Sequence, residues 1–318
     1  MLEINTNTNS HKTDNVKKIL IIYYSQSGQL QKVLDNIIAP MQQDSCISCD
    51  YKAIKPKNPF PYPWNFYEFF DVFPESVYLN GCEIEDLDTE EEYDLIILGY
   101  TVWFLSPSLP VTGFLQSAQA KKLLKDKPVI TVIACRDMWL TAQEKMKSLL
   151  SDINARLIDN VVLSDQGKSI HSFVTTPRWM LTGKKDAFWF FPRAGVHKNE
   201  ITATSRFGDR LCNALQNDEE RSNLPLLRNM AAVSVNGKLI ATEQIAHRSF
   251  LIWSKLIKKA GPQGSRGRNI VITIYAFFLL TLILTVVPLN MLIRKLISPF
   301  RKKALDKAVS YYEQPSGR

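Results

Sequence analysis

The stretch KKILIIYYSQSGQL, residues 17–30, decides the fold. It starts as a continuous apolar run of strand length and then turns small and polar at Ser25, Ser27 and Gly28. The residues that follow, up to Met41, place leucine, valine and isoleucine at helical spacing. A buried strand that passes through a small polar turn into a helix is the first unit of a parallel sheet covered on both faces.

Further apolar runs of strand length alternate with helical patterns along the chain. This alternation predicts an α/β fold with a doubly wound, five-stranded parallel sheet in the order 2-1-3-4-5. The expected strands are 17–24, 46–54, 94–100, 128–135 and 159–165, and the expected helices include 30–41, 109–125, 141–155 and 199–217.

Two aromatic segments interrupt this rhythm. Residues 56–80 hold five prolines and predict an elaborated crossover, while residues 165–198 predict an aromatic loop above the carboxyl edge of the sheet. The predicted organisation is a flexible arm (1–17), a domain (18–220) with inserts at 56–80 and 165–198, a basic connector (221–268), a hydrophobic membrane helix (269–293) and a basic tail (294–318).

Composition narrows the class of protein. With 45% hydrophobic residues and 16 phenylalanines the chain can bury a large core, which excludes global disorder. Five scattered cysteines and a polar start without an apolar leader favour a reducing compartment. Cys46 and Cys49 form the one close pair, and because no second pair accompanies it we expect no metal site.

The turn after the first strand predicts a phosphate site. Ligands of open parallel sheets bind outside the carboxyl ends of the strands, and backbone amides at a helix start attract anions. Gly28 allows close approach, and Ser25 and Ser27 add hydroxyl groups. The absence of a following lysine suits a phosphate monoester better than a nucleoside triphosphate. The alternative is a plain turn in which Ser27 caps the helix.

The loops after the third and fourth strands should open onto the same crevice. Their aromatic side chains suit a flat, partly polar ring, although each one alone is more simply explained by core packing. The candidate cofactor-binding residues of the three loops are Ser25, Gln26, Ser27, Gly28, Gln29, Leu30, Thr101, Val102, Trp103, Phe104, Cys135, Arg136, Asp137 and Trp139.

Two of these loops resemble those of flavodoxin-like flavoproteins. YYSQSGQLQKVLDNI is similar to their [ST]-x-[ST]-G-x-[ST] phosphate loop, with Leu30 in the last position. ILGYTVWFLSPSLPVTGFL looks like the flavin-ring loop of the NAD(P)H:quinone reductase and FMN reductase branch, with Val102 in place of proline. The resemblance implies FMN as cofactor and NAD(P)H as a second candidate.

A closer resemblance rests on the SQSGQ turn, the 56–80 insert and the long C-terminal extension. Together they resemble the dialkylresorcinol condensing enzymes of dialkylresorcinol and flexirubin-type pigment clusters. That resemblance implies a flavin-dependent aromatase, which oxidises a dialkyl cyclohexanedione made by a separate ketosynthase partner. Condensation itself needs an activated cysteine, and only Cys135, whose pKa the adjacent Arg136 would lower, suggests one.

Aromatisation also needs a general base. His171, expected in the loop after the fifth strand, is the first candidate, and Asp137 and Tyr100 are its rivals. Two non-enzymatic alternatives remain open: a membrane-tethered electron carrier of the flavodoxin type, and a flavin-less scaffold that binds the ketosynthase.

The segment 269–293 carries no charge and is long enough to cross a bilayer. Lysine and arginine flank it on both sides, which leaves three readings: a single span, a helix in the inner leaflet, or a buried core helix. The basic flanks suit anionic headgroups rather than nucleic acid. We therefore expect the protein at the cytoplasmic face of the inner membrane, acting on a lipophilic substrate, and a homodimer is compatible with the fold.

Overall fold

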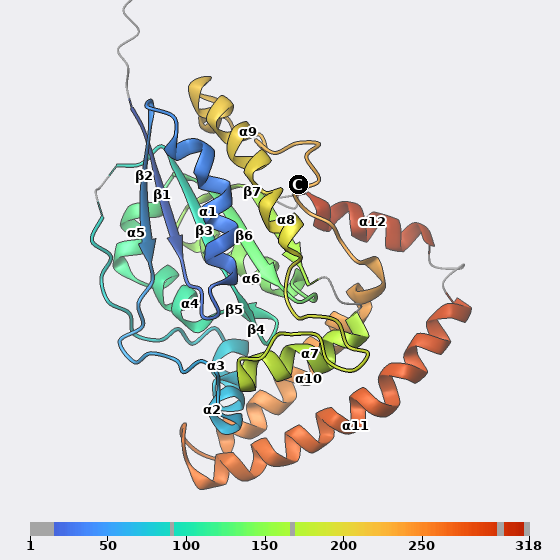
Figure 1. The fold of residues 1–318 in the computed structure, drawn as a ribbon. Helices are drawn as coiled ribbons and strands as arrows, with labels where there is room; N and C mark the ends of the chain where they lie inside the picture. The colour runs from blue at the N-terminus through green and yellow to red at the C-terminus, as the bar shows by residue number, and fades with distance from the viewer. Residues whose placement is uncertain (1–15, 90–91, 166–168, 298–301, 315–318) are drawn as a thin grey trace, which may run out of the picture.

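The computed structural model describes residues 16–89, 92–165, 169–297 and 302–314. Its centre is a parallel sheet in the order β2-β1-β3-β6-β7 (Figure 1). This is the predicted 2-1-3-4-5 order, so the flavodoxin-like α/β fold is confirmed. The strands are β1 (Lys17–Tyr23), β2 (Ile47–Ala53), β3 (Leu95–Tyr100), β6 (Pro128–Cys135) and β7 (Arg156–Ser164).

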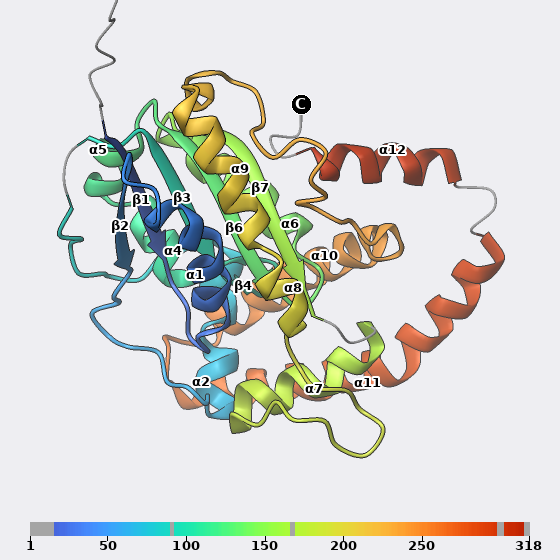
Figure 2. The same ribbon diagram turned by 45° about the horizontal axis from the view of Figure 1, so that its top comes forward.

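Helices cover both faces of the sheet because successive strand residues point to opposite sides. Ile19 and Ile21 of β1 pack under one helical layer, and Leu20 and Ile22 pack under the other. The first layer consists of α1 (Gln29–Gln42) and α9 (Ser205–Gln216). The second consists of α4 (Leu109–Leu115), α5 (Ala118–Leu124) and α6 (Leu140–Asp152); Figure 2 shows the two layers on either side of the strands.

Two predicted helices are each divided in the structure. The 109–125 pattern splits at Ser117, whose side chain accepts from the amide of Ala120 and starts α5 as a new helix. The 199–217 pattern splits into α8 (Lys198–Thr202) and α9. A period-3.6 pattern continues across such a break, so spacing alone does not reveal it.

The two inserts are more helical than predicted. Residues 56–80 contain α2 (Phe66–Asp71) and α3 (Phe73–Val77). The expected aromatic loop begins instead with α7 (Ser169–Thr182), and only the part after that helix is irregular. Between β3 and α4 lies a small hairpin of β4 (Val102–Trp103) and β5 (Ser106–Pro107).

The C-terminal part is helical as well. After the short turn η1 (Glu219–Arg221) it forms α10 (Gly237–Lys259), α11 (Arg266–Ile297) and α12 (Lys302–Glu313). Within the described residues one helix is long and apolar enough to cross a membrane, α11 over Arg266–Thr285, and 17% of that window is buried. That fraction is too low for a buried core helix. Most of the predicted arm (1–15) and parts of the predicted tail (298–301 and 315–318) lie outside the described residues.

Candidate functional site

The three predicted loops leave adjacent strands at the same edge of the sheet. The register places Tyr23 at the end of β1 beside Gly99 of β3, and Tyr100 of β3 beside Ile133 of β6. Because the strands are parallel, the loops that follow them lie next to one another. Residues 24–29, 101–104 and 135–139 therefore share one rim, at the carboxyl ends of the strands, where open α/β sheets bind their ligands.

The first loop leaves the start of α1 open. Gly28 is the N-cap, in the left-handed region at φ 75°, and no hydrogen bond from a side chain caps the helix. The expected alternative, a turn capped by Ser27, is therefore not formed. A Cβ built on Gly28 meets no atom within 4 Å, so there is free space beside the loop. Uncapped amides next to free space are the arrangement that attracts an anion.

A second helix, α6, also starts at this rim, but a carboxylate of the protein already accepts a hydrogen bond from its first turn. The carboxylate of Glu243, from α10, accepts a hydrogen bond from the amide of Thr141 in the first turn of α6. Burial raises the pKa of Glu243, and its hydrogen bonds to the start of α6 oppose that rise. An anionic ligand at the rim thus has α1, rather than α6, as its available helix start.

Each of the three loops carries a buried polar atom that lacks a hydrogen-bond partner in the described part of the chain. Among the described residues, no hydrogen-bond partner is found for Ser25 Oγ, Thr101 Oγ1 or Arg136 Nε. The same holds for Tyr62 Oη and Thr176 Oγ1, which belong to the two inserts. Buried polar groups in proteins are nearly always paired. Five of the twelve such atoms among the described residues belong to the three loops and the two inserts, which suits a site that receives a polar ligand.

Arg136 is the positive charge of the third loop. Its guanidinium lies 4.0 Å from the centroid of the Phe173 ring on α7. Burial lowers the pKa of Arg136 to about 10, and the carboxylates of Asp137 and Asp165 oppose that shift. Asp137 and Asp165 therefore already balance part of the Arg136 charge, and only its Nε is without a hydrogen-bond partner among the described residues.

Cys135, next to Arg136, does not have the character of a nucleophile. Burial and the nearby carboxylates of Asp137 and Glu243 raise the pKa of its thiol. The expectation that Arg136 lowers this pKa was wrong, because desolvation of the thiolate exceeds any attraction from the neighbouring charge. The structure thus offers no support for carbon–carbon condensation at this cysteine.

The aromatic residues of the second loop are enclosed by the 56–80 insert. The ring of Trp103 lies 5.1 Å from Phe60, 5.4 Å from Trp64 and 5.9 Å from Tyr24. The Gln26 side chain ties this insert to the first loop, because its amide donates to Pro61 O at 2.7 Å and its oxygen accepts from Trp64 Nε1 at 2.9 Å.

The remaining aromatic candidates have similar surroundings. Phe104 contacts the rings of Phe69 and Phe73, and Trp139 is buried in the core beside α6. In this structure these aromatic rings therefore pack in the protein core, which was the simpler explanation for each ring taken alone. Val102 and Leu30 also face protein atoms, in the same two apolar clusters.

The three catalytic candidates are not brought into contact with one another. His171 lies on α7, where its ring meets Phe191 edge-on at 5.9 Å. Tyr100 is fully buried, and its hydroxyl donates to Gln143 Oε1 at 2.7 Å. Burial raises the pKa of Tyr100 well above its ordinary value, which makes it unsuitable as a base. Asp137 lies on the third loop, half-buried.

Several contacts and residues near the rim were not predicted from the sequence. Gln29 Oε1 accepts from the amide of Val196 at 2.9 Å, and Asp165 accepts from the amide of Gly195 at 2.8 Å. The 194–196 segment thus lies beside the Gln29 side chain in the first turn of α1. Phe173 and Thr176 were missed because α7 was expected to be a loop; the helical spacing of apolar residues in IHSFVTTPRWML would have indicated them.

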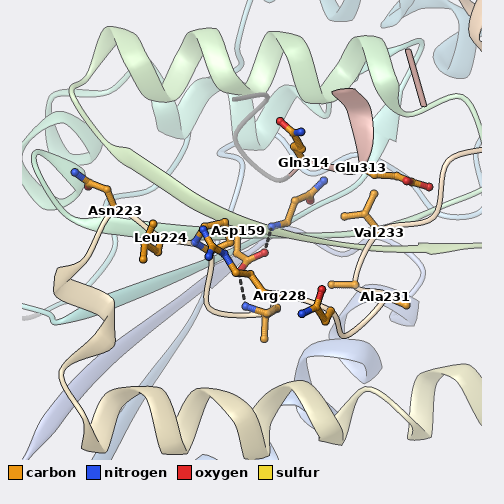
Figure 3. Close-up of a pocket in the computed structure, with 13 residues that line it drawn as sticks. Asp159, Asn223, Leu224, Arg228, Ala231, Val233, Glu313 and Gln314 are labelled. Atoms are coloured by element: carbon orange, nitrogen blue, oxygen red, sulfur yellow. Dashed lines mark hydrogen bonds between the residues drawn. The ribbon is translucent and has the colours of Figure 1, made fainter. Parts of the chain in front are cut away.

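Two cavities of the structure lie apart from the three loops. The larger, about 660 Å³, lies between β7, the 223–233 segment and the end of α12 (Figure 3). Its buried Asp159 is committed to the amides of Leu227, at 2.7 Å, and Asn160. A second, about 320 Å³, is lined by Tyr78, Asn80, Lys255 and Lys258. Neither is lined by a residue of the three loops.

No family model and no curated protein matches this chain. Among solved structures, a flavoprotein in complex with FMN from Lactobacillus acidophilus NCFM is 23% identical over 46% of this chain and 91% of its own, with a TM-score of 0.35. A flavodoxin from the domain Archaea is 10% identical over 63% and 99% (TM-score 0.35), and oxidised flavodoxin 1 from Bacillus cereus is 14% identical over 62% and 98% (TM-score 0.36). The assignment to the flavodoxin-like fold rests on this chain's own strand order.

Proposed function

We propose that this chain binds FMN at the rim formed by the three loops and acts as a flavin-dependent redox protein. The observation that carries the proposal is the set of unpaired buried polar atoms, Ser25 Oγ, Thr101 Oγ1 and Arg136 Nε, one on each loop. Proteins of similar fold include one in complex with FMN.

The first loop suits the phosphate of FMN. The uncapped start of α1 carries a partial positive charge, and the left-handed Gly28 lets a phosphate approach the amides. Ser25 and Ser27 add hydroxyl donors, and Arg136 supplies a full positive charge from the third loop. These groups favour FMN over riboflavin, which lacks the phosphate.

The ring of the cofactor would need the 56–80 insert to move. Trp64 and Phe60 now cover Trp103, and Gln26 holds them to the first loop. We propose that residues 60–64 act as a cover that opens for the ligand and excludes water once closed. The same packing favours a second candidate, the flavin-less scaffold, because in that case the cover never opens.

We further propose that the substrate is a lipophilic dialkyl cyclohexanedione, as the resemblance to the pigment-cluster proteins implies. When bound, the flavin supplies the oxidising equivalent for aromatisation. The chain supplies a base, for which His171 on α7 is the candidate, and an aromatic surround from the two inserts. We propose attachment to the cytoplasmic face of the membrane through the apolar surface of α11, which brings the protein to such a substrate.

The decisive experiment identifies the bound cofactor. Protein purified in mild detergent should show the visible absorbance of oxidised flavin, and mass analysis of the extract should give FMN. Ser27→Asp places a negative charge at the phosphate loop and should abolish flavin retention, whereas Ser234→Asp, in an exposed loop, should retain it. A Ser27→Asp protein that stays yellow would refute the phosphate assignment. Wild-type protein that binds no added FMN would favour the scaffold.

The redox roles are then separated with the holoprotein. Conversion of a cyclohexanedione to a product lighter by two hydrogens, measured by mass spectrometry, supports the aromatase. Flavin that is reduced and reoxidised without converting any dione supports the electron carrier.

A further inference from the structure

The first turns of α11 are fixed to the globular body. Arg268 is buried and forms ion pairs with Asp71 and Glu75 of the 56–80 insert, and its Nη1 donates to Glu75 Oε1 at 3.2 Å. About two turns further on, the ring of Tyr275 stacks on Phe73 at 4.8 Å. Phe278 contacts Trp253 at 5.0 Å and Leu279 packs against the same cluster, so the helix cannot leave the body before about residue 280.

The helix after α11 returns to the same body. Leu305, Val309 and Tyr312 of α12 pack against the core cluster that contains α6. The hydroxyl of Tyr311 donates to Glu144 Oε2 of α6 at 3.1 Å. Figure 1 shows α11 running along the outside of the molecule between these two attachments. Both ends of the apolar helix are thus held on one side.

Chain length makes a crossing incompatible with these two attachments. The apolar stretch left free, 280–293, rises about 21 Å as a helix, against about 30 Å for the hydrocarbon core. A helix that reached the far side would have to come back before α12, but the connection from Ile297 to Lys302 reaches at most about 18 Å. The single-span reading therefore conflicts with the position of α12.

The outward face of α11 is apolar and exposed. Phe277 is 68% exposed and Leu284 is 67% exposed, and no acidic residue occurs in the described part of this helix. These residues recur at helical spacing on one stripe. We call this face the outer stripe, which consists of Ile270, Ile274, Phe277 and Leu284.

Positive charge gathers beside the start of this stripe. Lys255, Lys258 and Lys259 at the end of α10 and Arg266 at the start of α11 are all exposed. Lys255 and Lys258 also line the cavity of about 320 Å³. An apolar stripe next to a cluster of lysines is complementary to a bilayer surface that carries anionic headgroups.

We propose that α11 lies in the plane of an anionic bilayer, with the outer stripe at the acyl boundary and the lysine cluster at the headgroups, and does not cross it. This refines the membrane attachment proposed above and does not depend on the flavin. The same helix packs on Phe70 of α2, so the membrane surface would lie beside the insert that covers the second loop. That position gives a lipophilic substrate a short path to the rim.

Vesicle binding tests the surface. The full chain should bind vesicles of phosphatidylcholine mixed with phosphatidylglycerol more tightly than phosphatidylcholine alone. The pair Lys255→Gln and Lys258→Gln should weaken binding about 25-fold, from about five-fold per lysine. Phe277→Glu should abolish it, while Leu224→Glu, an apolar position on the 223–233 segment that is 55% exposed, should bind like wild type. If Phe277→Glu and Leu224→Glu bind vesicles with equal affinity, the outer stripe is not the membrane-binding surface.

Labelling tests the topology. A Ser310→Cys variant on α12 is added to preformed vesicles and treated with a membrane-impermeant maleimide, with the exposed native Cys46 as internal reference. Both sites should react without detergent. Protection of Ser310→Cys until detergent is added would show that α11 crosses and would overturn the proposal. A second result would also overturn it: the chain is a dimer without vesicles, and Phe277→Glu converts this dimer to a monomer that still binds vesicles. Flavin content, measured on the same samples, separates this outcome from failure of the proposed redox function.

Discussion

Ser25→Ala is the sharpest test of the candidate site, because it should change stability and ligand affinity in opposite directions. The hydroxyl of Ser25 is buried without a hydrogen-bond partner among the described residues. An unpaired buried polar group costs about 1–3 kcal/mol. Removing it should therefore raise the unfolding free energy of the flavin-free chain by about 1 kcal/mol or more.

The same substitution should weaken FMN binding. A hydrogen bond to a charged group contributes about 1.5–3 kcal/mol, and a tenfold change in affinity corresponds to about 1.4 kcal/mol. If Ser25 Oγ donates to the phosphate, the Kd for FMN should rise about 10- to 150-fold. Urea unfolding of the flavin-free protein and titration of FMN by its fluorescence measure the two quantities separately.

Ser254→Ala is the matched control. Its hydroxyl is also buried without a partner among the described residues, but it lies on α10 and belongs to none of the three loops. It should raise stability and leave the Kd for FMN unchanged. If Ser25→Ala leaves the Kd unchanged, its hydroxyl is a packing defect and not a ligand group. A loss of stability in flavin-free Ser25→Ala would show that the hydroxyl has a partner within the protein.

Two further predictions concern the body of the protein. Arg268→Ala leaves two largely buried carboxylates unpaired, which costs about 3–5 kcal/mol. Hydrogen exchange in the first turns of α11 should therefore accelerate at least about 100-fold. If Arg268→Ala and the exposed control Arg266→Ala exchange at equal rates, the ion pairs of Arg268 do not hold α11 to the body. Burial raises the pKa of Asp159 from 3.8 to about 6, so the stability it contributes is fully present below about pH 4 and is lost as the pH rises through 6. The unfolding free energy of Asp159→Asn relative to wild type should therefore increase by about 3 kcal/mol between pH 4 and pH 7. If the difference in urea midpoint between the two proteins stays constant across this range, the pKa of Asp159 is not raised in the folded protein.

The sequence by itself determined the sheet. Buried parallel strands read as continuous apolar runs, and helices between them keep a period of 3.6 residues, so both signals are local. Gly28 and the hydroxyl residues of the first loop were likewise recognisable, because a strand that ends before a helix has its turn at a known edge. The alternation of strands and helices then left few possible strand orders.

Only the tertiary structure decided how the rim is filled and where the C-terminal helices lie. Trp103 looks the same in sequence whether it lines a crevice or packs under Trp64, because its environment is set by an insert that folds back over it. Arg268 pairs with Asp71, almost two hundred positions away, and α12 docks on α6 across a similar separation. Such contacts depend on which surfaces remain uncovered after the sheet has formed, and no periodicity along the chain records that.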